Sequence, residues 1–185
     1  MNDVIAAIMS RRSNRGFTEK AITEEQFAVL KECALASPTA MNAQSWHFSF
    51  VTDKSVISQV EKETVRCINA KSDESTKDRI ASRNFSIFYD APMVVFISAD
   101  NNSRWGDVDA GIAVENLAIA AQSMGLGSVI IGLCGMAFNG ENAEEMNRIC
   151  AIPEGHSYRI AISIGQPNVS KEAHPIGENK LSIID

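Results

Sequence analysis

The sequence predicts a single globular domain in which helices and strands are mixed, and three observations lead to this expectation. The chain has 185 residues, a length that suits one domain with one sizeable core. It is 45% hydrophobic and 22% charged, which is ordinary for a globular protein. Segments with helical spacing of apolar residues are interspersed with short runs typical of strands. Because no repeat or linker interrupts this pattern, we expect residues 1–185 to form one domain.

The first fifty residues predict two helices and a strand. One-sided apolar spacing predicts a helix over 3–12, carried by Val4, Ile5, Ile8 and Met9. Thr23 and Gln26 form a capping box, which starts a second helix that Pro38 closes. Residues 46–51 alternate large apolar with smaller or polar side chains, the period of a strand with one packed face.

A capped helix, a polar stretch and a buried strand come next. Asp53 caps a helix predicted over 54–70. The charge-rich stretch 71–83 is interpreted as a mobile insert, either a lid over a site or, more in keeping with its composition, a solvated connection. The short β-branched run 93–97 follows Ala91-Pro92 and predicts a buried strand, where the core sheet starts.

The second half contains the most apolar helix. Residues 107–124 are apolar nearly all round, so this helix is central to the domain, part of a subunit interface, or both. Gly125 supplies a left-handed cap, and 127–132 predicts another short strand. A helix over 142–150 and an alternating strand over 158–164 complete the predicted domain.

The C-terminal segment differs from the rest. Residues 171–185 are polar except for an apolar end at Leu181, Ile183 and Ile184, which predicts an extended arm that pairs with another surface.

Charge and cysteine usage limit the classes of function. The net charge of -6 gives no overall drive toward nucleic acid or an anionic membrane. No apolar run is long enough to span a bilayer and the N-terminus lacks a signal-peptide layout, so we expect a cytoplasmic protein that binds neither membrane nor nucleic acid. The cysteines are widely spaced and read as reduced core thiols, with Cys134 as a weaker candidate for a reactive thiol. The histidines show no metal-ligand spacing, so no metal site is predicted.

Three arginines and a serine are concentrated at the end of the first predicted helix. Guanidinium groups match phosphate oxygens in a bidentate way, and a hydroxyl can add a neutral donor. The cluster is therefore a candidate phosphate site, consisting of Arg11, Arg12, Ser13 and Arg15. The alternative is a surface cluster that complements the negative end of the helix dipole.

Several familiar motifs are missing. Gly125-Leu126-Gly127 lacks the third glycine of a dinucleotide fingerprint, and no glycine pair leads into a P-loop lysine. No serine sits in a nucleophile elbow, so hydrolytic chemistry has little support.

Three segments in register nevertheless resemble one known family. Residues 11–15, the segment 37–48 (SPTAMNAQSWHF) and the segment 124–128 (MGLGS) strongly resemble the nitroreductase family of FMN-dependent oxidoreductases. The resemblance extends from about residue 3 to Pro167. It implies an α+β, three-layer α/β/α fold with a central, mostly antiparallel sheet. It also implies an obligate homodimer with an exchanged C-terminal arm and with FMN bound in the dimer interface.

The resemblance also assigns cofactor-binding residues. Arg11 and Arg12 would face the phosphate, Ser13 the phosphate or ribityl chain, and Arg15 the pyrimidine end of the flavin ring. A second group would come from the partner subunit, namely Pro38, Thr39, Ala40 and Asn42. Backbone N–H groups at a strand end would face flavin N5 and O4, namely those of Ile130, Ile131, Gly132 and Leu133.

Two departures from the family pattern stand out. Longer members have an acidic residue where this chain has Gly132, so that side chain's contribution to a substrate pocket is missing. The family's C-terminal basic pair is also absent, which leaves Lys171 and Lys180 as candidates to replace it.

The function implied is oxidation of NADH or NADPH and reduction of a nitroaromatic, quinone or similar electron-poor acceptor, in a ping-pong sequence without a catalytic side chain. A narrower member of the superfamily, with a pocket shaped by 71–83, is an alternative. So is a flavin-binding redox sensor or flavin store with little turnover. The remaining hypothesis is a protein without a cofactor that dimerises through the apolar helix.

Overall fold

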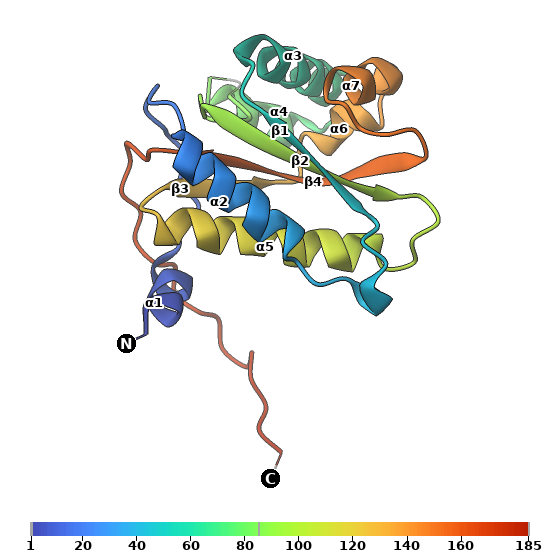
Figure 1. Ribbon diagram of the computed structural model, residues 1–185. Helices are drawn as coiled ribbons and strands as arrows, with labels where there is room; N and C mark the ends of the chain where they lie inside the picture. The colour runs from blue at the N-terminus through green and yellow to red at the C-terminus, as the bar shows by residue number, and fades with distance from the viewer. Residues whose placement is uncertain (1, 85, 185) are drawn as a thin grey trace.

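The computed structural model describes residues 2–84 and 86–184. Within these ranges the chain forms one sheet with helices on both of its faces (Figure 1). The helices are α1 (Asp3–Ser10), α2 (Glu24–Leu35), α3 (Lys54–Lys71), α4 (Glu74–Ala81), α5 (Gly106–Ser123), α6 (Gly135–Phe138) and α7 (Ala143–Ile149), with a 3-10 turn at Ala40–Asn42. The strands are β1 (Trp46–Val51), β2 (Met93–Asp100), β3 (Gly127–Ile131) and β4 (His156–Gly165).

The sheet has the strand order β1-β2-β4-β3, and each neighbouring pair is antiparallel. In the register, Phe48 lies opposite Ile97, and Ile130 lies opposite Ile162. The predicted antiparallel sheet is confirmed. The last strand along the chain, β4, inserts between β2 and β3, so β3 is an edge strand of this sheet and its outer side is available to other segments.

The core lies on both faces of the sheet. In β2, Val94 and Phe96 belong to a cluster that packs under α3, α6 and α7, whereas Val95 and Ile97 pack on the other side against α2 and α5. Alternate residues of one strand are therefore buried on opposite faces, which explains why β2 is apolar along its length. This arrangement confirms the predicted three layers.

The helix boundaries follow the capping residues named from the sequence. Thr23 Oγ1 accepts from the Gln26 N–H at 3.2 Å, and Gln26 Oε1 accepts from the Thr23 N–H at 3.1 Å, which completes the capping box. Asp53 accepts from the Ser55 N–H at 2.7 Å at the start of α3. Gly125 has φ +72° just after α5, the left-handed conformation expected of its cap.

The stretch 71–83, interpreted as a mobile insert, contains a helix that the sequence analysis does not predict. Asp73 accepts from the Thr76 N–H at 2.7 Å and begins α4, and Ile80 anchors that helix with 1% of its surface exposed. Two short elements, α6 and the turn at Ala40–Asn42, were not predicted. The first helix ends at Ser10 rather than at residue 12, because Arg11 has ψ 134° and leaves the helical region.

Strand β2 is longer than predicted, because it continues from Ile97 to Asp100. Its register against β4 shifts at Ile97/Ser98. Ser98 and Ala99 pair with both β1 and β4, and Asp100 pairs with β4.

The apolar helix α5 is central to the domain, which is one of the two roles that the sequence predicts for it. Leu117 and Ala121 are fully buried against the sheet, whereas Val108 and Ile112 remain 54% and 38% exposed. One side of α5 therefore packs in the core, and an apolar side stays uncovered within the single chain.

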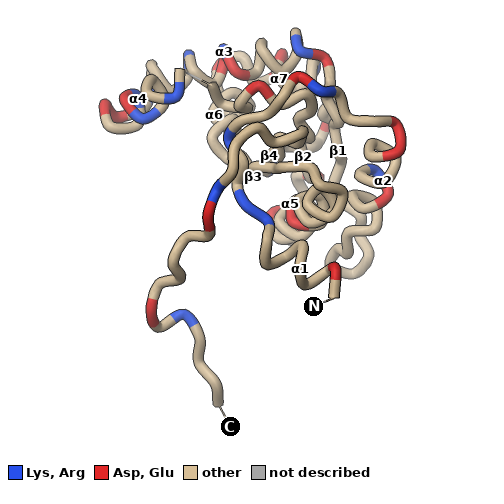
Figure 2. Tube along the Cα trace, turned by 90° about the vertical axis from the view of Figure 1, so that its left-hand side faces the viewer, with Lys and Arg blue, Asp and Glu red and all other residues tan. Residues whose placement is uncertain are grey.

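The C-terminal segment leaves the body of the molecule as an extended arm (Figure 2). Residues 170–184 form neither helix nor strand, and Ile176, Leu181 and Ile184 are at least 82% exposed. This conformation matches the predicted arm, and its apolar side chains have no surface to cover them within the described chain. None of the helices in the described ranges combines the length and apolar character needed to cross a membrane.

Candidate functional site

The arginine-rich segment after α1 is fastened to the free edge of β3. Ser13 forms a parallel bridge with Ser128, and the Asn14 N–H donates to the Ser128 carbonyl at 2.9 Å. A Cβ on Gly127 would lie 2.9 Å from Asn14 Cγ, so this close approach requires glycine. The segment that carries Arg15 is thereby held against the sheet although the Arg15 side chain is exposed.

Arg15 and the end of β3 line the same cavity, which has a volume of about 250 Å³. The structure thus brings residues 130–133 together with Arg15, one of the four residues predicted in the arginine-rich segment. Gly132 is exposed, and a Cβ there would meet only Ile160 Cδ1 at 3.8 Å. Packing within the chain therefore does not require a glycine, and the residue leaves bare backbone at the cavity.

The two other arginines of the cluster lie along α1 and α5. Arg11 is half-buried, with Nε 3.7 Å from Glu115 Oε1. Arg12 Nη1 donates to the carbonyls of Met9 at 2.8 Å and Arg11 at 2.7 Å. Arg12 thus satisfies carbonyl groups at the C-terminal end of α1, which is the structural role weighed against phosphate binding.

The third predicted group lies elsewhere in the chain. The turn at 38–42 sits at the start of α5, where the Ala40 N–H donates to Asp109 Oδ1 at 3.1 Å. Its tip is strained and exposed: Met41 and Asn42 have φ 56° and 54°, and Met41 is 99% exposed. Thr39 Oγ1 stabilises the turn by accepting from the Gln44 N–H at 2.9 Å.

Within the described chain, this turn lines neither of the two cavities that Arg15 lines. The end of α1 contacts the far end of α5, where Gln122 Nε2 donates to Ser10 Oγ at 3.2 Å. Asp109 and Gln122 are thirteen residues apart on one helix, which at 1.5 Å per residue corresponds to roughly 20 Å. Arg11 lies closer to the segment that carries this turn than Ser10 does, because it pairs with Glu115, and the next residue, Asn116, donates through Nδ2 to Ser37 Oγ at 3.0 Å.

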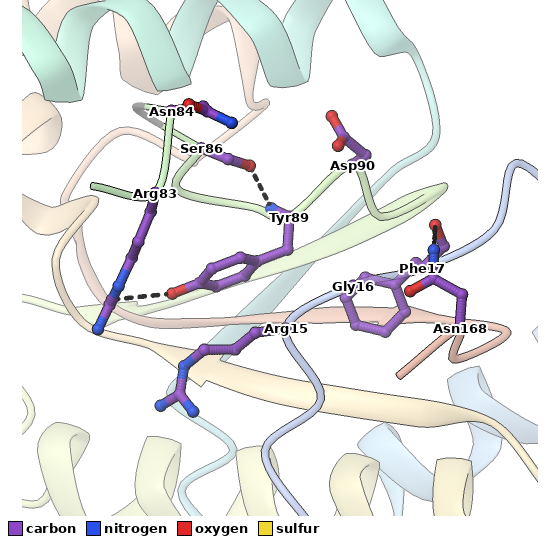
Figure 3. A pocket seen from close by; sticks show the side chains of 9 residues that line it. All are labelled: Arg15, Gly16, Phe17, Arg83, Asn84, Ser86, Tyr89, Asp90 and Asn168. Atoms are coloured by element: carbon purple, nitrogen blue, oxygen red, sulfur yellow. Dashed lines mark hydrogen bonds between the residues drawn. The ribbon is translucent and has the colours of Figure 1, made fainter. Parts of the chain in front are cut away.

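Sequence reasoning missed three residues at the Arg15 cavity. Arg79 and Arg83, from α4 and the residues just after it, line the cavity with Tyr89. Arg83 Nη1 donates to the Tyr89 hydroxyl at 3.1 Å, and in Figure 3 the side chains of Arg83 and Arg15 extend toward the hydroxyl end of that ring. Tyr89 lies in a strained turn with φ 59°.

A sequence signal for α4 did exist. Asp73 is a good N-cap, Glu74 stands in the first turn and Arg79 in the last, the charge order that a helix dipole favours. Charge-rich composition outweighed this signal in the interpretation of the segment.

Cys134 is a core thiol rather than a reactive one. It is fully buried, burial raises its pKa to about 12, and Sγ lies 3.1 Å from the Tyr158 hydroxyl. A thiol with so high a pKa is almost wholly protonated at neutral pH and is a poor nucleophile. Cys67 and Cys150 are also buried and Cys33 is half-buried.

Comparison with known proteins settles the family. The model of the Nitroreductase family matches residues 8–166, most of the chain. The chain belongs to the nitroreductase family. It is 28% identical over 179 residues to the NADPH-flavin oxidoreductase of Vibrio harveyi, a match that covers 95% of this chain and 70% of the relative.

Solved nitroreductase structures have the same fold. The nitroreductase of Desulfitobacterium hafniense with bound FMN is 29% identical, with a TM-score of 0.94 over 100% of both chains. The FMN-dependent nitroreductase of Clostridium difficile is 30% identical, with a TM-score of 0.82 over 99% of both chains. The family resemblance seen in residues 11–15, 37–48 and 124–128 is therefore confirmed.

Proposed function

We propose that this protein is an FMN-dependent NAD(P)H oxidoreductase that reduces nitroaromatic, quinone or similar electron-poor acceptors in a ping-pong sequence. The observation that carries the proposal is the shared cavity of Arg15 and the β3 end, in a chain of the nitroreductase family. The NADPH-flavin oxidoreductase of Vibrio harveyi and the FMN-bound nitroreductase of Desulfitobacterium hafniense support the same donor and cofactor.

The residues present fit FMN. When bound, FMN supplies the two-electron chemistry, and the chain supplies binding, orientation and charge. Arg11 and Ser13 offer a cation and a hydroxyl suited to a phosphate and ribityl chain. The Arg15 guanidinium would stabilise negative charge at the pyrimidine end of the ring, and the bare backbone at Gly132 would offer N–H groups to the ring edge. We assign no side chain as a general acid or base.

The separation of the two residue groups supports a homodimer with shared sites. Pro38, Thr39, Ala40 and Asn42 line neither of the two cavities that Arg15 lines in its own chain. A two-fold dimer formed through the uncovered side of α5 would place the turn of one chain beside the arginines of the other. The strained, exposed tip of the turn is then the part that contacts the partner's cofactor.

Removal of two arginines tests the assignment. We expect Arg11→Ala combined with Arg15→Ala to strip flavin from the purified protein, because charge-assisted contacts at both ends of the cofactor are lost. The ratio of flavin absorbance to protein absorbance measures this loss. Arg148→Ala is the matched control, because Arg148 pairs only with Glu145 on α7. Full flavin retention in the double variant would contradict the assignment.

Anaerobic absorption spectra test the donor reaction. We expect flavin bands in the purified protein that bleach on addition of NADPH or NADH. Bound flavin that neither donor bleaches would favour a redox sensor or flavin store instead. A colourless protein that takes up no added FMN would overturn the proposed function.

A further inference from the structure

The cavity beside Arg15 carries more positive charge than binding of a flavin ring edge requires. Arg79 and Arg83 line it together with Arg15, so three guanidinium groups surround about 250 Å³. Within residues 2–84 and 86–184, neither Arg79 nor Arg83 forms an ion pair with a carboxylate. The chain as a whole has a net charge of -6, so this concentration of cations is local.

The cavity walls combine these cations with apolar surface. Ile80 and Ile87 from the α4 side and Val129 and Ile131 from β3 also line the cavity, and all four are buried. Asp90 lines the neighbouring cavity that Arg15 and Arg83 share, and it does not line this one. A ring would find apolar contacts here, and an anionic substituent on that ring would find guanidinium donors.

The cations are placed by the fold rather than by chance exposure. Ile80 anchors α4, and Arg79 directly precedes it. The Tyr89 hydroxyl fixes Arg83 at 3.1 Å, and Tyr89 is itself held because its N–H donates to Ser86 Oγ at 2.9 Å (Figure 3). Both side chains are exposed, so solvent weakens each single contact, and it is their convergence on one small cavity that favours an anion there.

We propose that Arg79 and Arg83 bind an anionic group on the oxidising substrate, so that this enzyme prefers acceptors whose reducible ring carries a carboxylate or similar anion. The inference rests on the proposed function, which places the reacting ring beside Arg15 and Gly132. The 2′-phosphate that distinguishes NADPH from NADH lies at the other end of the nucleotide from the nicotinamide ring, whereas these arginines share one small cavity with Gly132.

A matched pair of acceptors tests the preference. We expect the wild-type protein to give a higher kcat/KM for 4-nitrobenzoate than for 4-nitrobenzamide, which has the same shape and no charge. In the variant Arg79→Gln with Arg83→Gln, this ratio should fall on the order of tenfold or more, because charge-assisted hydrogen bonds are lost. Arg79→Lys with Arg83→Lys should retain much of the preference, since charge remains. Arg148→Gln, on the exposed side of α7, should leave the ratio unchanged.

Binding of unreactive analogues gives a readout that does not depend on turnover. Calorimetric titration of the oxidised, flavin-loaded protein should show tighter binding of benzoate than of benzamide, and the difference should disappear in the glutamine variant. Equal binding of the two analogues by the wild type, together with equal kcat/KM for the two nitro compounds, would overturn the inference.

Two further measurements separate the possible failures. If the glutamine variant slows flavin reduction by NADPH but not by NADH, and the acceptor ratio is unchanged, the arginines bind the nucleotide phosphate and the inference is overturned. If the protein holds flavin, accepts electrons from NAD(P)H and reduces menadione but shows no charge preference, only this inference fails. A protein without flavin, or without menadione turnover, overturns the proposed function and the inference with it.

Discussion

One buried carboxylate, Glu63, ties the helical layer above the sheet together. Its two oxygens accept from Arg66 Nε and Nη2, both at 2.8 Å, and Asn142 Nδ2 donates to it at 3.0 Å. These contacts join α3 to the residue that precedes α7. The hydrogen bonds from Arg66 are the main reason that the pKa of Glu63 falls from 4.5 to about 2.

This lowered pKa predicts a loss of stability in acid. The native state holds Glu63 ionised, so its contribution is complete above pH 4.5 and is lost as the pH falls toward 2. Glu63→Gln should therefore lower the free energy of unfolding at pH 7 by about 1–2 kcal/mol, a value reduced for the solvent exposure of Arg66. The difference from the wild type should shrink toward pH 2, as measured by urea unfolding. Glu141→Gln, at an exposed partner of Arg66, should change little; an equal effect of both variants would contradict this account.

The candidate site could be foreseen only where local sequence carries the signal. Arg15 and Gly132 stand in segments whose residue types indicate an anion site and a close backbone approach. Arg79 and Arg83 come from a charge-rich stretch and meet Arg15 only because α4 docks beside β3. The sequence contains no periodic pattern or motif spacing that would indicate this contact between distant segments.

At the scale of elements, α4 depends on one apolar side chain. Ile80 is 1% exposed, and no other residue of the helix is buried. An eight-residue helix has little stability of its own, so docking of Ile80 must hold it in place.

Truncation of that anchor should loosen α4 selectively. Ile80→Ala removes a buried side chain, at a cost of about 2–4 kcal/mol where it packs. We expect amide hydrogen exchange to accelerate across 74–81 while the amides of β2 remain protected. The reason is that the lost packing energy makes α4 detach from the domain without unfolding the sheet. Ile176→Ala, at an exposed position on the arm, is the control and should change neither. Uniform acceleration across the sheet would show instead that α4 unfolds only with the whole domain.

Most longer elements were predictable from periodicity and capping, and the exceptions have physical reasons. The helix α5 and the strand β4 are long enough to show their period and end at turn-forming glycines. The four-residue α6 and the 3-10 turn at Ala40–Asn42 are too short to show one. The extension of β2 to Asp100 depends on pairing with its neighbours, which a local pattern cannot show.

At the scale of the whole molecule, apolar surface is concentrated on one side. A groove between α1, α2 and α5, with a volume of about 570 Å³, is lined by Val4, Ile8 and Ile119 among others. Ile112 extends the same face of α5. It lies one turn before Asn116 and two turns before Ile119. Exposed apolar faces of this kind are typical of protein–protein contacts, so this is the face on which we expect the partner subunit to bind.

A charge on this face should disrupt the assembly and the cofactor site together. Ile112→Glu would bury an unpaired carboxylate in the proposed interface, so we expect the dimer dissociation constant to rise by roughly a hundredfold or more. Because residues 38–42 line neither of the Arg15 cavities of their own chain, the resulting monomers should also release FMN. Size-exclusion chromatography with light scattering measures the first effect, and the flavin-to-protein absorbance ratio measures the second. Ser75→Glu, which adds the same charge on exposed α4, should leave both unchanged. Dissociation with full flavin retention would mean that each chain completes its own site, and an intact dimer would place the interface on another surface.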